Sequence, residues 1–107
     1  MTPQELFDEL AAEHLSRPEV AMGRMLRTDG LKVHGKVFAM LVNERLVVKV
    51  PASQAAALVA DGQAVPLETG RGRKMKEWVS VSGTEGDTWA QLMSDAFGYV
   101  ESISRPG

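Results

Sequence analysis

Two histidines and a short basic run are the residues of this chain whose chemistry could support a function. His14 and His34 are far apart in the sequence, and neither has a second histidine or a carboxylate at a spacing typical of a metal site. The serines near Val81 do not form the G-x-S-x-G motif of a nucleophile elbow. The chain contains no cysteine, which excludes thiolate catalysis and cysteine-bound zinc. We therefore expect a protein that is not an enzyme and that holds no cofactor or metal.

Basic residues are concentrated in the middle of the chain, whereas both ends are net acidic. The densest basic run, residues 71–76, contains glycine and could follow a phosphate backbone. With the cations of the preceding strands it gives a candidate nucleic-acid surface: Arg24, Arg27, Lys32, Lys36, Arg71, Arg73, Lys74 and Lys76. The alternative is a solvated loop, because the run is short and has no interleaved aromatic residue. Arg24 and Arg27 would lie on opposite faces of a regular strand, so a single basic face requires a bulge.

An antiparallel sheet centred on residues 31–50 would position these side chains. This segment is rich in valine and other residues that suit a pleated sheet. His34-Gly35 and Asn43-Glu44 interrupt it at positions that are compatible with tight turns. Residues 20–33 begin the sheet, and Asp29-Gly30 could be a further hairpin turn that divides them into two short strands.

The strand expected at residues 37–42 is apolar on both faces. An antiparallel sheet with helices on one side normally has a polar open side. We therefore expect one face to pack under helices and the other to meet a second covering or a partner. With Trp78 of the strand at 75–81, the candidate protein interface consists of Phe38, Met40, Val42 and Trp78. The expected partner is a protein, with a homodimer as the favoured form.

The helices expected at the two ends of the chain have clear signals. Thr2 and Glu5 form a capping box, with Pro3 at the first helical position. The last helix begins near Thr84 or Asp87. Its apolar stripe recurs at helical spacing and comprises Trp89, Leu92, Met93, Ala96, Phe97 and Val100.

A short helix is also expected over residues 54–60, with Ser53 as its N-cap. Its buried side would include Ala56, Val59 and Ala60. The resulting order is α-β-β-β-α-β-β-α. It predicts a two-layer α+β fold with a five-stranded antiparallel sheet, in a single domain spanning residues 1–107.

The N-terminal segment has no basic region followed by a long apolar run, so a signal peptide is not expected. No stretch approaches the roughly 20 apolar residues of a membrane-spanning helix. With the lack of cysteine, these features predict a cytoplasmic protein.

Several short motifs together resemble the N-terminal domain of the TfoX/Sxy family. They are Gly23-Arg24-Met25, Asp29-Gly30-Leu31, the segments GKVFAM and RLVVK, and the segment MKEWVSV. The MmcQ/YjbR-like domains share the G-K-x-F-A and W-V-x-V runs and give a second resemblance. Both families are similar in fold to secretion-chaperone domains.

The TfoX/Sxy resemblance implies a bacterial competence regulator that acts with the cyclic-AMP receptor protein at promoters. Full-length members have a C-terminal helical domain that is absent from this sequence. What the resemblance implies here is therefore an accessory module that regulates transcription through protein contacts. The alternative is a DNA-binding regulator that uses the basic sheet and loop surface.

Overall fold

The computed structural model describes residues 2–25, 28–68 and 74–105. In these ranges the helices are α1 (Pro3–Leu15), α2 (Ala52–Ala60) and α3 (Gly86–Ser104). The strands are β1 (Val20–Met25), β2 (Thr28–Val33), β3 (Lys36–Val42), β4 (Arg45–Lys49), β5 (Ala64–Glu68) and β6 (Lys74–Val81). All strand pairs are antiparallel, in the order β1-β2-β3-β4-β6-β5.

The α+β class and the antiparallel sheet agree with the sequence prediction, but the sheet has six strands rather than five. The extra strand arises because residues 20–33 form both β1 and β2, which pair from Val20↔Val33 to Met25↔Thr28. The alternative of a hairpin turn at Asp29-Gly30 is wrong, because both residues lie inside β2. The connection between the two strands falls at residues 26–27, outside the described residues.

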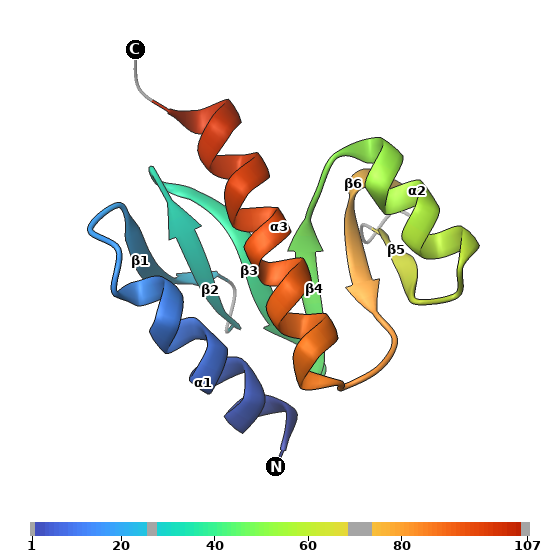
Figure 1. Ribbon diagram of the computed structural model, residues 1–107, viewed down its shortest axis with the longest axis horizontal. Coiled ribbons are helices and arrows are strands. Elements are labelled where there is room, and N and C mark those ends of the chain that lie inside the picture. Colours follow the sequence, from blue (N-terminus) through green and yellow to red (C-terminus); the bar gives the residue numbers. More distant parts are fainter. Residues whose placement is uncertain (1, 26–27, 69–73, 106–107) are drawn as a thin grey trace.

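All three described helices lie on one face of the sheet (Figure 1). Helix α3 crosses over β3 and β4, α1 lies beside β1, and α2 lies beside β5 and β6. One buried cluster includes Phe7 of α1, Leu58 of α2 and Trp89 of α3 together with Val48 and Val79 of the sheet. Since apolar burial is the main favourable term in folding, this shared core fixes the helices on the same side.

Helix α1 begins as the sequence predicts. The Glu5 amide donates to Thr2 Oγ1 at 3.1 Å, and the Thr2 amide donates to Glu5 Oε1 at 3.0 Å. Helices α2 and α3 start without a side-chain cap, after Pro51 and Glu85. The predicted N-caps of these two helices are therefore wrong: Ser53, and Thr84 or Asp87.

A β-bulge changes the face on which Phe38 lies. The register between β2 and β3 shifts after the Leu31↔Ala39 pair, which leaves Phe38 as an extra residue in β3. Its ring is fully buried on the helical side. The centroid of this ring lies 5.5 Å from the centroid of the His14 ring and 5.5 Å from that of the Phe97 ring. The prediction that Phe38 shares an outer face with the interface residues is therefore wrong.

Candidate interaction surface

The sheet face opposite the helices is called the open face here. On β3 and β4, the Met40↔Val47 and Val42↔Arg45 pairs lie on this face, because the alternate Ala39↔Val48 pair belongs to the core. The same alternation places Lys49 and Val47 opposite Trp78 and Ser80 of β6. We define the apolar patch as Val37, Met40, Val42, Val47 and Trp78.

Val47 is the centre of the apolar patch. It is 1% exposed although no described helix covers it, because Met40 and Ser80 flank it on the two neighbouring strands. The other patch residues are partly exposed. Trp78 is therefore partly exposed, whereas Trp89 is fully buried in the core.

Three cations surround the apolar patch: Lys32, Arg45 and Lys49. Arg45 donates from Nε to the Val81 carbonyl at 3.3 Å, and Lys49 Nζ lies 3.9 Å from Glu77 Oε1. The Lys32 stem lies across Gly23, where an added Cβ would come within 2.5 Å of Lys32 Cε. Glu77, on β6, is thus the described carboxylate that pairs with a cation of this face.

The structure brings together three of the four predicted interface residues, Met40, Val42 and Trp78. It does not gather the predicted basic residues. Lys32 is on the open face, Lys36 is exposed at the start of β3, and Lys76 lies beside α2. Arg27, Arg71 and Arg73 lie outside the described residues, as do the side chains of Arg24 and Lys74.

Sequence reasoning missed Val47, Arg45 and Lys49 as members of this surface. The signal was present in the turn between β3 and β4. Asn43 and Glu44 both have positive φ, 51° and 64°, which is the geometry of a two-residue hairpin with a fixed register. Counting outward from that turn would have placed Val42 and Arg45 opposite one another.

A groove of about 460 Å³ lies on the helical side, between α2 and the β5–β6 pair. Small apolar side chains of α2 line it together with Pro66 and Val79, and Lys76 is its charged lining residue. The α2 residues predicted to be buried line this groove instead: Ala56, Val59 and Ala60. The α2 residues that are buried in the core are Ala55 and Leu58. Neither histidine is among the groove's lining residues.

His14 has a structural role in the core. Its Nδ1 lies 2.8 Å from Arg17 Nη1, and because arginine can only donate, Nδ1 accepts this bond. Burial lowers the pKa of His14, and the nearby Arg17 charge lowers it further. The Arg17 guanidinium also lies 4.4 Å from the centroid of the Phe97 ring. His14 accepts on an unprotonated Nδ1, and through Arg17 it connects α1 to Phe97 of α3.

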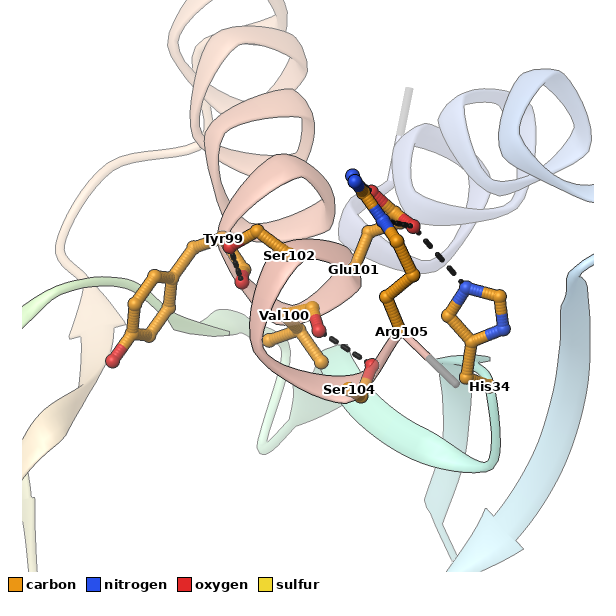
Figure 2. Close-up of polar contacts among 7 residues, drawn as sticks. All are labelled: His34, Tyr99, Val100, Glu101, Ser102, Ser104 and Arg105. Carbon is orange, nitrogen blue, oxygen red and sulfur yellow. Dashed lines mark hydrogen bonds and ion pairs between the residues drawn. The ribbon is translucent and has the colours of Figure 1, made fainter. Parts of the chain in front are cut away.

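His34 joins the β2–β3 turn to the end of α3. Figure 2 shows Glu101 between His34 and Arg105, with Oε2 at 3.2 Å from His34 Nε2 and 3.0 Å from Arg105 Nε. The hydrogen bonds from Arg105 and then His34 lower the pKa of Glu101 to about 2. Tyr99 points away from this cluster and donates to Glu77, which raises the pKa of Tyr99.

Over residues 2–25, 28–68 and 74–105 there is no group of three or more His, Cys, Asp or Glu residues that could hold a metal ion. The helices of this part of the chain are each too short or too polar to cross a membrane.

Residues 15–98 match the family model of YjbR. This match corresponds to the second of the two resemblances noted in the sequence. The TfoX/Sxy N-terminal domain, which the sequence suggested first, is not the family that this match shows. No curated protein matches the chain.

Proposed function

This chain belongs to the YjbR family, and we propose that it is a non-enzymatic domain that binds another protein through the open face of its sheet. The observation that carries this proposal is the apolar patch, which lies at the centre of the sheet without a helix over it among the described residues. An open antiparallel face is normally polar. Partly exposed apolar side chains there indicate a binding site.

The composition of the patch favours a protein partner. Met40 and Trp78 belong to the residue types that are enriched at the centres of protein interfaces. Val47 is already buried, so a partner would gain free energy by covering the partly exposed residues around it, at roughly 25 cal/mol per Å² of apolar area. The surrounding cations would then form the polar rim of the interface.

The two histidines support a non-enzymatic function. His14 is buried and hydrogen-bonded to Arg17, and His34 is paired with Glu101. Both side chains connect secondary structure elements, and neither lines the groove beside α2. As the specific role we propose an accessory regulator of transcription that acts by contacting another protein.

Nucleic-acid binding is a second candidate, and the charge of the open face favours it. Three cations of the described residues, Lys32, Arg45 and Lys49, lie on this face. Two of these cations, however, already have protein partners. Since nucleic-acid affinity depends on cations that contact phosphates, we place this candidate second.

Site-specific photo-crosslinking tests the protein-binding proposal. A photoreactive residue is placed at Val42 on the open face and, as a matched control, at exposed Gln91 on α3. Both variants are expressed in the organism that encodes the chain. We expect an adduct with one protein from position 42 and none from position 91, and we expect the purified partner to bind the unmodified chain. Equal labelling from both positions, or no adduct at position 42, would overturn the proposal.

Tryptophan fluorescence provides the test of nucleic-acid binding. Trp89 is buried, so a ligand on the open face would change mainly the emission of Trp78. A short labelled duplex is titrated at low and at physiological salt, with the wild type and with Lys32→Ala. Salt-sensitive binding that quenches Trp78 and weakens in the variant would establish this second function. Unchanged emission at low salt would exclude it.

A further inference from the structure

We propose that β1 pairs with β1 of a second copy of this chain, antiparallel and about a two-fold axis at Met22. The two sheets would then form one continuous sheet across a homodimer. This surface is separate from the open face, so the inference is independent of the proposed function.

The backbone of β1 has free hydrogen-bonding groups that point away from the sheet. The His34 amide donates to the Glu19 carbonyl at 3.2 Å, so Glu19 and His34 form a hydrogen-bonded pair between the two strands. Every second pair after it, such as Ala21↔Lys32, is hydrogen-bonded in the same way. Gly23, for example, faces Gly30 of β2. The amide and carbonyl of Met22 therefore point toward the outer edge, where no described strand pairs with them.

The opposite edge of the sheet has a feature that prevents such pairing. The Ser82 amide donates to the Gln63 carbonyl at 2.9 Å, so Val65 forms the next hydrogen-bonded pair with β6. The backbone nitrogen and carbonyl of Pro66 therefore face the outer edge of β5. Proline has no N–H to offer to an added strand. Proline on an edge strand is one of the devices by which proteins block edge-to-edge association. Strand β1 contains no proline.

The sequence of β1 suits pairing with itself. With Met22 on the two-fold axis, Met22 faces Met22 of the second copy and Ala21 faces Gly23. The small residues thus share one face of the new sheet. Met22 is 40% exposed in the single chain, and the dimer would cover it. The Met22 amides and carbonyls would bond to each other, and the Arg24 amide would reach the Val20 carbonyl.

The difference between the two edges also determines the size of the assembly. In the dimer the β1 edge of each copy is paired with that of the other copy. The β5 edge of each copy is then the remaining edge of the described sheet. Since Pro66 lies on each of these, the sheet does not extend further. An isologous interface of this kind gives a closed dimer rather than a fibre.

Light scattering coupled to size exclusion tests the dimer. The wild type should have twice the 11.6 kDa mass of one chain. Met22→Lys should raise the dissociation constant about tenfold or more, because a lysine on an edge strand opposes pairing. The matched control is Val65→Lys on the β5 edge, where Val65 is 44% exposed, and this variant should remain dimeric. Circular dichroism must show that both variants are folded.

A cysteine at Met22 tests the register directly. The chain has no cysteine of its own, so each variant has a single thiol. Directly opposed residues of a hydrogen-bonded antiparallel pair have Cα atoms about 5.5 Å apart, which is within the range that a disulfide spans. Met22→Cys should form a covalent dimer in oxidised glutathione, and Val65→Cys should not.

The inference is wrong if the wild type is a monomer at about 0.5 mM. It is also wrong if Met22→Lys leaves the dimer intact or if Met22→Cys fails to crosslink. None of these results depends on the apolar patch, because Met22 lies at the edge of the sheet and on its other face. Failure of this inference would therefore leave the proposed function unaffected.

Discussion

His14 makes the stability of the protein depend on pH. The ordinary pKa of histidine is about 6.5, and burial lowers the pKa of His14 in the folded chain. Below about pH 6.5 the unfolded chain therefore binds more protons than the folded chain, and the free energy of unfolding falls. The stabilisation is complete above that pH and is lost as the pH falls through the lower folded pKa.

Thermal unfolding at about pH 7.5 and about pH 5.5 tests this effect. We expect the Tm of the wild type to be lower at the acidic pH. His14→Phe keeps an aromatic ring against Phe38 and removes the titrating group, so its Tm should fall less between the two pH values. Equal decreases in the wild type and the variant would contradict the role assigned to His14.

Glu101 should titrate far below an ordinary glutamate. Its pKa is lowered to about 2, first by Arg105 and then by His34. Its contribution to stability is therefore present above the ordinary glutamate pKa of 4.5 and is lost as the pH falls toward about 2. Arg105→Ala should raise the pKa of Glu101, as measured by NMR titration of the carboxyl group. Ser102→Ala, on the same turn of α3, should leave it unchanged.

The turns before and after β3 each contain a residue with positive φ, and substitutions there should change the stability in opposite directions. Glu44 has a φ of 64°, a conformation that glycine adopts without strain. Glu44→Gly should stabilise the protein by about 0.5–1 kcal/mol, seen as a Tm increase of several degrees. Gly35 has a φ of 80°, so Gly35→Ala should lower the Tm by a similar amount. A lower Tm for Glu44→Gly would contradict this expectation. It would show that the Glu44 side chain makes a contact that stabilises the protein by more than the relief of backbone strain.

The helices at the two ends of the chain were predictable because their signals are local. The capping box of Thr2 and Glu5 depends on three-residue spacing, and the stripe of α3 depends on the 3.6-residue period. Helix α2 was harder, since its sequence is apolar almost all round and periodicity defines no single face. Its buried side was therefore assigned to the wrong residues.

The strands were predicted less well because their details depend on pairing between distant segments. The bulge at Phe38 comes from the register of β3 against β2, which the pattern within β3 does not contain. The division between β1 and β2 falls at Leu26-Arg27, a dipeptide without the usual turn residues. Alternation within β3 predicts that Met40 and Val42 share a face, and the register of β4 with β3 and β6 adds Trp78 to it.

At the scale of the whole molecule, the helices lie on one side of the sheet (Figure 1). The strand register places the apolar patch on the other side. Acidic residues are concentrated in the terminal helical segments, whereas the cations Lys32, Arg45 and Lys49 lie on the open face. In the proposed dimer, the two open faces would continue across β1 and present two copies of the patch to a partner. This arrangement would let a weak single contact be strengthened by a second one.

Isothermal titration calorimetry with the purified partner, once photo-crosslinking has identified it, is the most direct test of binding at the open face. Val42→Asp places a charge on the patch without altering the core, and Gln91→Asp adds the same charge on exposed α3 as the control. We expect Val42→Asp to weaken binding about tenfold or more, which is about 1.4 kcal/mol, and Gln91→Asp to bind like the wild type. Wild-type affinity in a folded Val42→Asp variant would contradict the claim that the open face binds the partner.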